Sequence, residues 1–285
     1  MQSVCSALLL LVIFHCLHET SSLPLPSARP VPGSRLDPSA AVSPSFSGPL
    51  GTSADQFFLK TFRSGLSQTL LKPDTDFADG YEGMMDMVRE LHQTSSTPAE
   101  AVARARRTLV NLFPDFPPSL KPGLPGLLYW FQILFAGPFP AFSAKLNTRV
   151  TSLAAQWLMG PCEVLDLDST SSSSLPSSPP PLLAAGDGSS QLLLVKRCRY
   201  LEEGNCASLC VHTCKLPTQQ FFNEDMRVPM RMIPDYETYE CRFEFGVRPT
   251  SEDEQDAKDI PCFSACSLKG RGKEIGLEEP CMEPA

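Results

Sequence analysis

The stretch CRYLEEGNCASLCVHTCKLPTQQFF, residues 198–222, places four cysteines and one histidine within seventeen positions. Its last three cysteines, Cys206, Cys210 and Cys214, are four residues apart from one another, a spacing that puts side chains on one face of a helix. Cysteines at this density indicate a metal site, a disulfide framework or a sulfur-rich packed core. The rest of the chain bears on that choice.

Cysteine is distributed unevenly along the 285 residues. Two of the eleven cysteines, Cys5 and Cys16, lie in an N-terminal leader, and the other nine lie between Cys162 and Cys281. Nine is odd, so these cysteines cannot all pair within one chain, and residues 52–161 contain none. A secreted disulfide scaffold is usually small and bridged throughout, so this distribution favours metal ligation or reduced thiols. Cys162 and Cys281 are candidates for small, packed core residues.

A single metal centre limits which of these cysteines act together. On a regular helix, the outer members of a set at i, i+4 and i+8 are about 12 Å apart along the axis. Gly204-Asn205 and Leu216-Pro217 predict breaks only at the two ends of this helix. We therefore expect a neighbouring pair from the helix to combine with cysteines from elsewhere. The cysteines available for this are Cys198, Cys241, Cys262 and Cys266.

Histidine adds little to such a site. Only His92 and His212 lie outside the leader, and an iron site of two histidines and a carboxylate would need both. His212 is a candidate metal ligand, proton donor or packed core histidine, and it is our candidate catalytic residue. The chain has no glycine-rich phosphate loop, no G-x-S-x-G and no H-E-x-x-H, so nucleotide-driven chemistry, serine hydrolysis and zinc proteolysis have no support.

The charge of the chain argues against nucleic acid as a partner. The net charge is −8, and no stripe of lysine and arginine is present to neutralise phosphates. The densest basic patch is RARR at 104–107, which we expect to be a solvated helix face.

The N-terminus consists of two segments of different composition. Residues 1–22 contain the apolar run ALLLLVIF, which has the length of a secretory signal core, and residues 23–50 are rich in serine, proline and alanine. Together they resemble the two-part address of plastids reached through the endomembrane system. The alternative is a secreted protein with a disordered pro-segment. We expect one ordered domain over 51–285 and a plastid location.

Helical periodicity dominates the first half of that domain. The pattern predicts helices over about 52–71, 83–92, 97–113 and 143–158. The clearest start is Thr97-Pro98-Ala99-Glu100, which combines a capping threonine, a proline at the first helical position and a glutamate three residues after the cap.

Residues 122–144 form a run of 23 residues without a charge. Prolines and glycines cut the smooth apolar part to residues 127–137, which is too short to cross a bilayer. We expect a broken apolar hairpin. It either packs inside the domain, or faces a membrane surface or a long apolar ligand.

Strands are expected in the second half of the domain. Residues 162–166 and 191–198 are predicted to pair in one sheet, joined by a Ser/Pro-rich insertion at 167–190 that we expect to be disordered. Thr218 is expected to cap a short helix over 219–224.

The segment YECRFEF, residues 239–245, alternates between apolar and charged positions. This alternation predicts a strand that turns Cys241 inward and Glu240, Arg242 and Glu244 outward. Residues 251–259 are acidic and are expected to be a solvated linker. The predicted fold class is α+β, with a helical N-terminal half packed on a small, cysteine-rich, sheet-containing C-terminal half.

Several blocks of the chain together resemble one known family. They are WLMGPCEV at 157–164, KRCRYLEE at 196–203, CASLCVHTCKLPT at 206–218, Val228-Pro229 and YECRFEFG at 239–246. These blocks are similar to those of the plastid β-carotene isomerases of the Dwarf type, which begin strigolactone synthesis in plants. The resemblance covers residues 52–282 loosely and 157–266 closely, and the two-part leader suggests an algal member.

The resemblance implies an iron-dependent enzyme that interconverts all-trans- and 9-cis-β-carotene without net redox change. It also implies a carotenoid substrate, a plastid membrane surface as partner, and iron held by thiolates or in an iron–sulfur centre. The positions that match the family's cysteine pattern are Cys198, Cys206, Cys210, Cys214, Cys241, Cys262 and Cys266. Two alternatives stay open: a non-enzymatic, disulfide-bonded binding module and a redox-sensing protein without substrate turnover.

Overall fold

The computed structural model describes residues 48–167, 183–251 and 253. The predictions for the leader at 1–22, for nearly all of the segment at 23–50 and for most of the acidic linker lie outside the described residues. So do Cys262, Cys266 and Cys281.

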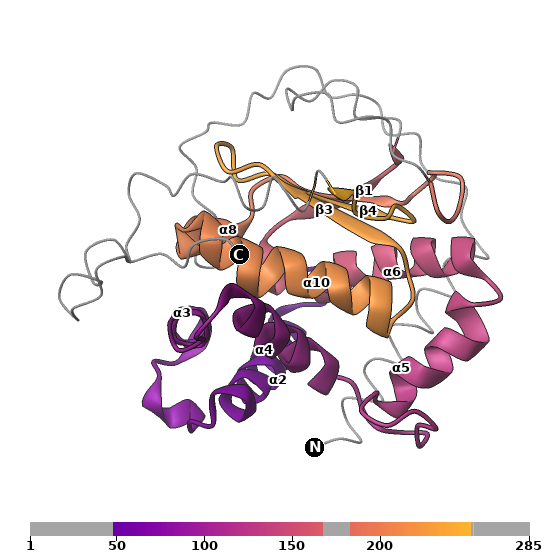
Figure 1. Cartoon of the computed structure of the whole chain (residues 1–285). Helices are drawn as coiled ribbons and strands as arrows, with labels where there is room; N and C mark the ends of the chain where they lie inside the picture. Colours follow the sequence, from indigo (N-terminus) through magenta and orange to yellow (C-terminus); the bar gives the residue numbers. More distant parts are fainter. Residues whose placement is uncertain (1–47, 168–182, 252, 254–285) are drawn as a thin grey trace.

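Three helices form the first layer of the domain, the purple elements of Figure 1. They are α2 (Thr52–Leu70), α3 (Gly80–Gln93) and α4 (Pro98–Asn111), and a short 3₁₀ turn, η1 (Asp74–Asp76), links the first two. The predicted start of α4 is confirmed, because the Thr97 hydroxyl accepts a hydrogen bond from the Glu100 N–H at 3.1 Å. Methionines dominate the buried side of α3, where Met84, Met85 and Met87 are fully buried.

The uncharged segment forms the broken hairpin that its prolines predict. It contains α5 (Gly126–Phe131), the π-helical turn η2 (Gln132–Ala136) and the start of α6 (Pro140–Ala154), and α7 (Gln156–Met159) follows. The hairpin lies at the edge of the molecule in Figure 1. The packed alternative is confirmed for one side of the hairpin, and the other side is exposed. Contact of the exposed side with a membrane or an apolar ligand stays a prediction. No helix in the described ranges has the length and apolar character needed to span a membrane.

A four-stranded antiparallel sheet forms the opposite layer. Its strands are β1 (Cys162–Leu165), β2 (Leu192–Val195), β3 (Met230–Pro234) and β4 (Cys241–Phe245), in the order β1-β2-β4-β3. The predicted pairing of the first two strands is confirmed. The third strand was not predicted, since its alternation is short and ends in a proline, which usually marks a strand edge.

The predicted disorder over residues 167–190 is wrong for residues 183–190. Here the chain is fixed by the buried side chain of Gln191, whose Oε1 accepts a hydrogen bond from the Gly188 N–H at 2.8 Å and whose Nε2 donates to the Ala185 carbonyl at 2.8 Å. A polar side chain that satisfies buried backbone groups orders a segment whose own composition would leave it unfolded.

The outward position predicted for Glu244 is also wrong, because this side chain is only 2% exposed. The register places Arg231 of β3 directly opposite, and its Nε and Nη2 atoms donate to Glu244 Oε2 at 3.0 and 2.7 Å. The unpredicted strand therefore supplies the counter-charge that permits burial of the carboxylate. The carboxylate of Asp253 lies 3.6 Å from Nη1 of the same arginine and adds a second negative charge beside it.

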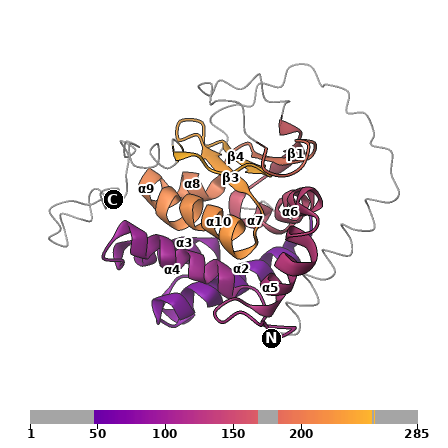
Figure 2. The same ribbon diagram turned by 45° about the vertical axis from the view of Figure 1, so that its right-hand side comes forward.

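A single continuous helix crosses the molecule between the two layers. It comprises α9 (Ala207–Cys210), the π turn η4 (Val211–Lys215), α10 (Leu216–Gln220) and the π turn η5 (Phe221–Asp225), and α8 (Arg199–Gly204) precedes it. We call residues 207–225 the central helix. Both ribbon views show it between the purple helices and the sheet (Figures 1 and 2). The predicted α+β class is confirmed, with this helix as its middle layer.

The predicted break at Leu216-Pro217 is wrong, and no separate helix begins at Thr218. A proline inside an α-helix normally clashes with the carbonyl four residues earlier and leaves one hydrogen bond unmade. The wide π turn that precedes Pro217 relieves this clash, because its backbone bonds span five residues, as in the bond from the Leu216 N–H to the Val211 carbonyl. The helix therefore continues through the proline.

The basic patch at 104–107 is only partly a solvated face. Arg106 reaches the end of the central helix, where its Nε and Nη2 atoms bind the carboxylate of Asp225 at 2.7 and 2.9 Å. Arg104 donates to Ser95 Oγ at 3.1 Å, and Arg107 is exposed. Two of the three arginines thus connect elements of the fold.

Candidate active site

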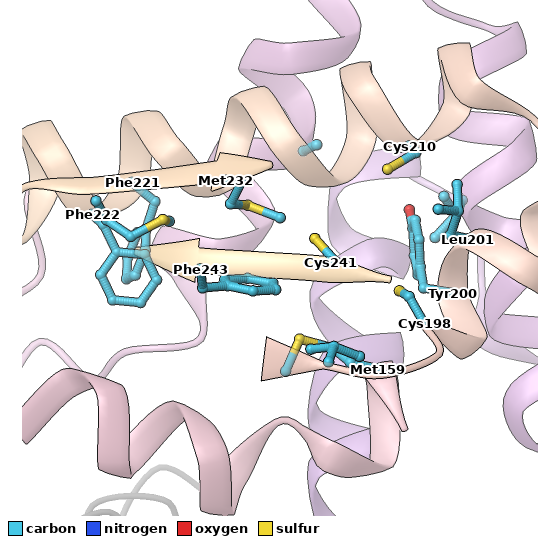
Figure 3. Close-up of a cluster of buried hydrophobic side chains, with 14 of the residues drawn as sticks. Met159, Cys198, Tyr200, Leu201, Cys210, Phe221, Phe222, Met232, Cys241 and Phe243 are labelled. Carbon is cyan, nitrogen blue, oxygen red and sulfur yellow. The ribbon is translucent and has the colours of Figure 1, made fainter. Parts of the chain in front are cut away.

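Four thiols converge between the central helix and the sheet. Cys210 and Cys214 belong to the central helix, Cys198 precedes α8 and Cys241 begins β4. We call these four residues the thiol cluster. Figure 3 shows the sulfur atoms of Cys198, Cys210 and Cys241 around the ring of Tyr200. The inward orientation predicted for Cys241 is confirmed, since this residue is 3% exposed.

Burial and mutual proximity raise the pKa values of Cys198, Cys210 and Cys241. Desolvation, and next the neighbouring Cys214, raise the pKa of Cys198 to about 12. The contact with Cys214, followed by desolvation, raises the pKa of Cys210 well above its usual range. Desolvation and the nearby Cys198 do the same to the pKa of Cys241. These three thiols are therefore uncharged at neutral pH, which lowers the cost of their burial.

Tyr200 adds a phenol to the thiol cluster. Its hydroxyl lies 2.7 Å from Thr213 Oγ1, and Thr213 in turn donates to the Leu209 carbonyl at 2.5 Å. Thr213 has one hydroxyl proton, so Tyr200 must be the donor in the first bond. Desolvation, with a smaller contribution from Cys214, raises the pKa of Tyr200 well above its usual range. The phenol is thus neutral and held in a fixed orientation.

Apolar and sulfur-containing side chains surround these groups. Met159, Met232 and Phe243 lie on the sheet side of the central helix close to the thiol cluster (Figure 3), and all three are buried. These three side chains are polarizable and uncharged. They are compatible with a hydrocarbon and unsuited to a charged substrate.

The six cysteines within the described ranges are all free thiols, so none of them forms a disulfide. Among the same residues, no three cysteine, histidine, aspartate or glutamate side chains converge closely enough to hold a metal ion. The donor type nevertheless suits a soft metal, because thiols bind iron once they lose their protons. The described residues therefore provide suitable ligand chemistry without the geometry of a complete site.

Two cysteines lie outside the thiol cluster. Cys206 caps the N-terminus of α9, where its sulfur accepts a hydrogen bond from the Leu209 N–H at 3.4 Å. Cys162 lies on β1 and donates to the Ser152 carbonyl at 3.7 Å, and desolvation raises its pKa to about 12. Cys162 packs against the core, as the sequence predicts. The predicted grouping of Cys206 with Cys210 and Cys214 rests on their spacing and on the family's cysteine pattern.

The other side of the central helix carries an imidazole pair, His92 and His212. Their rings stack at 5.7 Å between centroids and 21° between planes, which joins α3 to the central helix. Ser208 Oγ lies 3.2 Å from His92 Nε2 and 3.2 Å from His212 Nδ1. The serine hydroxyl has one proton, so it donates to one ring and accepts from the other.

Burial keeps both imidazoles neutral. Desolvation, and next the partner ring, lower the pKa of His92 to about 4, and desolvation lowers the pKa of His212. The candidate catalytic residue His212 thus faces α3 on the side away from the thiol cluster. No sequence pattern indicates the role of Ser208, because a single serine in a helix has no periodicity of its own.

Comparison with known proteins shows which proteins this part of the chain is similar to. Residues 157–254 match the family described as beta-carotene isomerase D27-like, C-terminal. This segment contains the whole sheet, α7, α8, the central helix and all four members of the thiol cluster. The helices α2 to α6 lie outside the matched residues.

Two curated relatives agree with the family match. The chloroplastic beta-carotene isomerase D27 of Arabidopsis thaliana is 29% identical over 134 residues, which are 47% of this chain and 45% of the relative. The protein of the same name from Medicago truncatula is 29% identical over 119 residues, which are 42% of this chain and 41% of the relative. The aligned part thus spans less than half the length of each relative. No solved structure matches the chain.

Proposed function

We propose, on the premise that residues 157–254 belong to the D27-like C-terminal family, that this protein is a carotenoid cis/trans isomerase that acts on β-carotene in plastids. The observation that carries the proposal is that the family segment coincides with the part of the fold that assembles the thiol cluster. The finer form of the proposal is interconversion of the all-trans and 9-cis isomers. The names of both relatives, which include beta-carotene isomerase and chloroplastic, support the substrate and the compartment.

Isomerisation of a polyene requires that the order of one double bond is lowered for the time of a rotation. A proton or an electron exchanged with the polyene and afterwards returned achieves this without net chemical change. The thiols of Cys210 and Cys241 and the phenol of Tyr200 have raised pKa values and are therefore weak acids. This weakness favours electron exchange over protonation as the route.

We accordingly propose iron as the cofactor, held by two or more cysteines of the thiol cluster. Bound iron would supply the one-electron exchange that the thiols and the phenol do not provide. The proposal rests on ligand type and on the family resemblance. The chain itself contributes soft ligands on both the helix and the sheet, and an apolar setting from which water is excluded. Loss of the thiol protons would accompany metal binding, so iron affinity should increase with pH.

The proposed substrate also makes a membrane a partner. β-Carotene is an uncharged hydrocarbon that dissolves in lipid rather than in water. An isomerase of this substrate must therefore contact a plastid membrane or receive carotenoid from a carrier. We propose direct contact with the membrane.

The test is activity and metal content of the full chain, purified without oxygen and given all-trans-β-carotene in detergent micelles. Products are separated by chromatography, and iron is measured by elemental analysis and absorption spectroscopy. We expect 9-cis-β-carotene and iron–thiolate absorption bands. In the Cys210→Ala variant, isomer formation should fall by about a hundredfold or more, in the range that single catalytic groups contribute.

Cys162→Ala is the matched control. This cysteine has a similarly raised pKa but lies outside the thiol cluster, so its replacement should leave the isomer yield close to that of the wild type. A folded, metal-free chain that produces no isomer would contradict the proposed function. Equal losses in the two variants would instead show that the thiol cluster is not where the reaction occurs.

A further inference from the structure

The hairpin of α5, η2 and α6 presents an unusually apolar surface. Nine large hydrophobic side chains are exposed in the described part of the chain, and five of them lie within residues 133–142. We call these five the apolar surface: Ile133 (47% exposed), Leu134 (53%), Phe135 (39%), Phe139 (58%) and Phe142 (37%). The rings of Phe135 and Phe142 lie 6.4 Å apart, so the π turn and α6 form one continuous patch. Patches of this kind mark interaction sites.

The apolar surface is exposed although the hairpin that carries it is firmly anchored. On the inner side, Leu128, Gln132, Ala136 and Ala144 are buried. The Gln132 side chain donates to the Asp225 carbonyl at the end of the central helix, at 2.7 Å. The hairpin thus has a fixed inner side, and the five apolar residues are directed outward by the fold.

The chemistry of the patch suits lipid better than another protein. Residues 122–144 contain no charged residue, whereas protein interfaces usually have a polar rim that makes hydrogen bonds. Lysines stand at both limits, Lys121 and Lys145, as expected where a segment passes from the apolar layer to lipid headgroups. Tyr129 and Trp130 are half-buried near the base of the hairpin, and such aromatic residues favour the membrane interface.

Electrostatic attraction is not the main force. The chain has a net charge of −8, and Lys145 is already paired with Asp187 at 2.9 Å. Contact with an anionic membrane would therefore depend on burial of apolar side chains and not on a basic patch.

We propose that the apolar surface inserts into the interfacial layer of a lipid bilayer and holds the protein there as a peripheral membrane protein. The insertion is shallow, because the helices of the hairpin are too short to span the hydrocarbon layer. This proposal rests on the proposed function in one respect only, which is the reason for membrane binding: the protein would take its hydrocarbon substrate from the membrane. Membrane binding itself requires no catalysis.

The test is flotation of the full chain with carotenoid-free vesicles of phosphatidylcholine, at low and at high salt. We expect the wild-type chain to float with the vesicles, with little dependence on salt. The double variant Leu134→Glu, Phe135→Glu should bind at least about tenfold more weakly, because two apolar side chains lose their burial in lipid. Leu71→Glu is the matched control, since Leu71 is 90% exposed at the end of α2, outside the apolar surface.

Two kinds of result would overturn the proposal, one in the flotation experiment and one in the oligomeric state. One is a folded wild-type chain that does not float, or a double variant that floats equally well. The other is a wild-type dimer that the double variant converts to a monomer, which would identify a second copy as the occupant of the patch. Activity on carotene in detergent micelles separates this proposal from the proposed function. Vesicle binding without isomerisation would contradict only the proposed function. Isomerisation without vesicle binding would contradict only the proposal that the apolar surface binds a membrane.

Discussion

The two sides of the central helix both bury titratable groups, but burial shifts the pKa values on the two sides in opposite directions. Toward the sheet lies the thiol cluster, in which burial raises the pKa values of acids. Toward α3 lies the imidazole pair, in which burial lowers the pKa values of bases. Both environments keep their groups neutral, but the first responds to metals and oxidants and the second to acid.

The two sides also differ in where their residues come from. The thiol cluster is built entirely from the family segment at 157–254. The imidazole pair joins that segment to α3, because His92 contacts Ser208 across 116 positions of the chain. We conclude that the thiol side is the candidate for chemistry and that the imidazole side connects the helical layer to it.

The largest expected effect is on isomerase activity, which should depend on the thiol side of the central helix and not on the imidazole side. Cys241→Ala should lower isomerase activity by about a hundredfold or more, if the thiol cluster supports the reaction. His92→Gln, on the imidazole side, should change activity by no more than a small factor. The measurement is initial rate of isomer formation with both variants at equal concentrations of folded protein. A large loss in His92→Gln alone would reverse our assignment of the two sides.

Acid should act on the imidazole side. The pKa of His92 is about 4 in the folded chain and 6.5 when unperturbed, so between these values the unfolded chain binds more protons. The stability from neutral His92 is therefore complete above about pH 6.5 and is lost as the pH falls toward 4, by about 3 kcal/mol in total. Urea unfolding across this range measures the loss. A His92→Gln variant with the same pH dependence would show that His92 is not responsible.

Ser208→Ala should have a smaller effect. The substitution leaves an imidazole nitrogen buried without its hydroxyl partner, which costs about 1 to 3 kcal/mol of unfolding free energy. Ser208→Thr keeps the hydroxyl and serves as the control. Chemical denaturation of both variants at neutral pH tests this, and equal stabilities would mean that the serine bridge contributes nothing.

Substitution of Cys206 should have the smallest effect, and it tests whether this cysteine belongs to the thiol cluster. As a helix cap, it should tolerate Cys206→Ser, whereas Cys206→Ala should lose about 1 kcal/mol of unfolding free energy. Neither variant should reduce iron content or activity. Loss of iron in Cys206→Ser would instead identify Cys206 as a metal ligand.

Much of the fold was predictable because local patterns agreed with the final structure. Helix periodicity and the cap at Thr97 located α2, α3 and α4, and strict alternation located β4. Some buried positions, such as Cys241 on β4, followed from this period, whereas the buried position of Glu244 on the same strand did not. The free state of the described cysteines also agreed with the odd cysteine count.

The candidate site was predicted only in part, because contacts across the chain assemble it. Spacing and the family's cysteine pattern grouped Cys206 with Cys210 and Cys214. In the structure, Cys206 is a helix cap, and the other two lie beside Cys198 and Cys241. The pairing of His92 with His212 likewise depends on how α3 packs. Periodicity describes one element at a time and does not contain this information.

The sequence by itself determined the α+β class, most element positions and the similarity of residues 157–254 to the D27-like C-terminal family, since each depends on local pattern or on residue identity. Only the tertiary structure decided that Pro217 lies within a continuous helix, that Glu244 is buried against Arg231 and that an uncharged hairpin has one buried and one exposed side. The physical reason is that burial and hydrogen bonding are set by neighbours distant in sequence, and these outweigh local propensity where the two conflict.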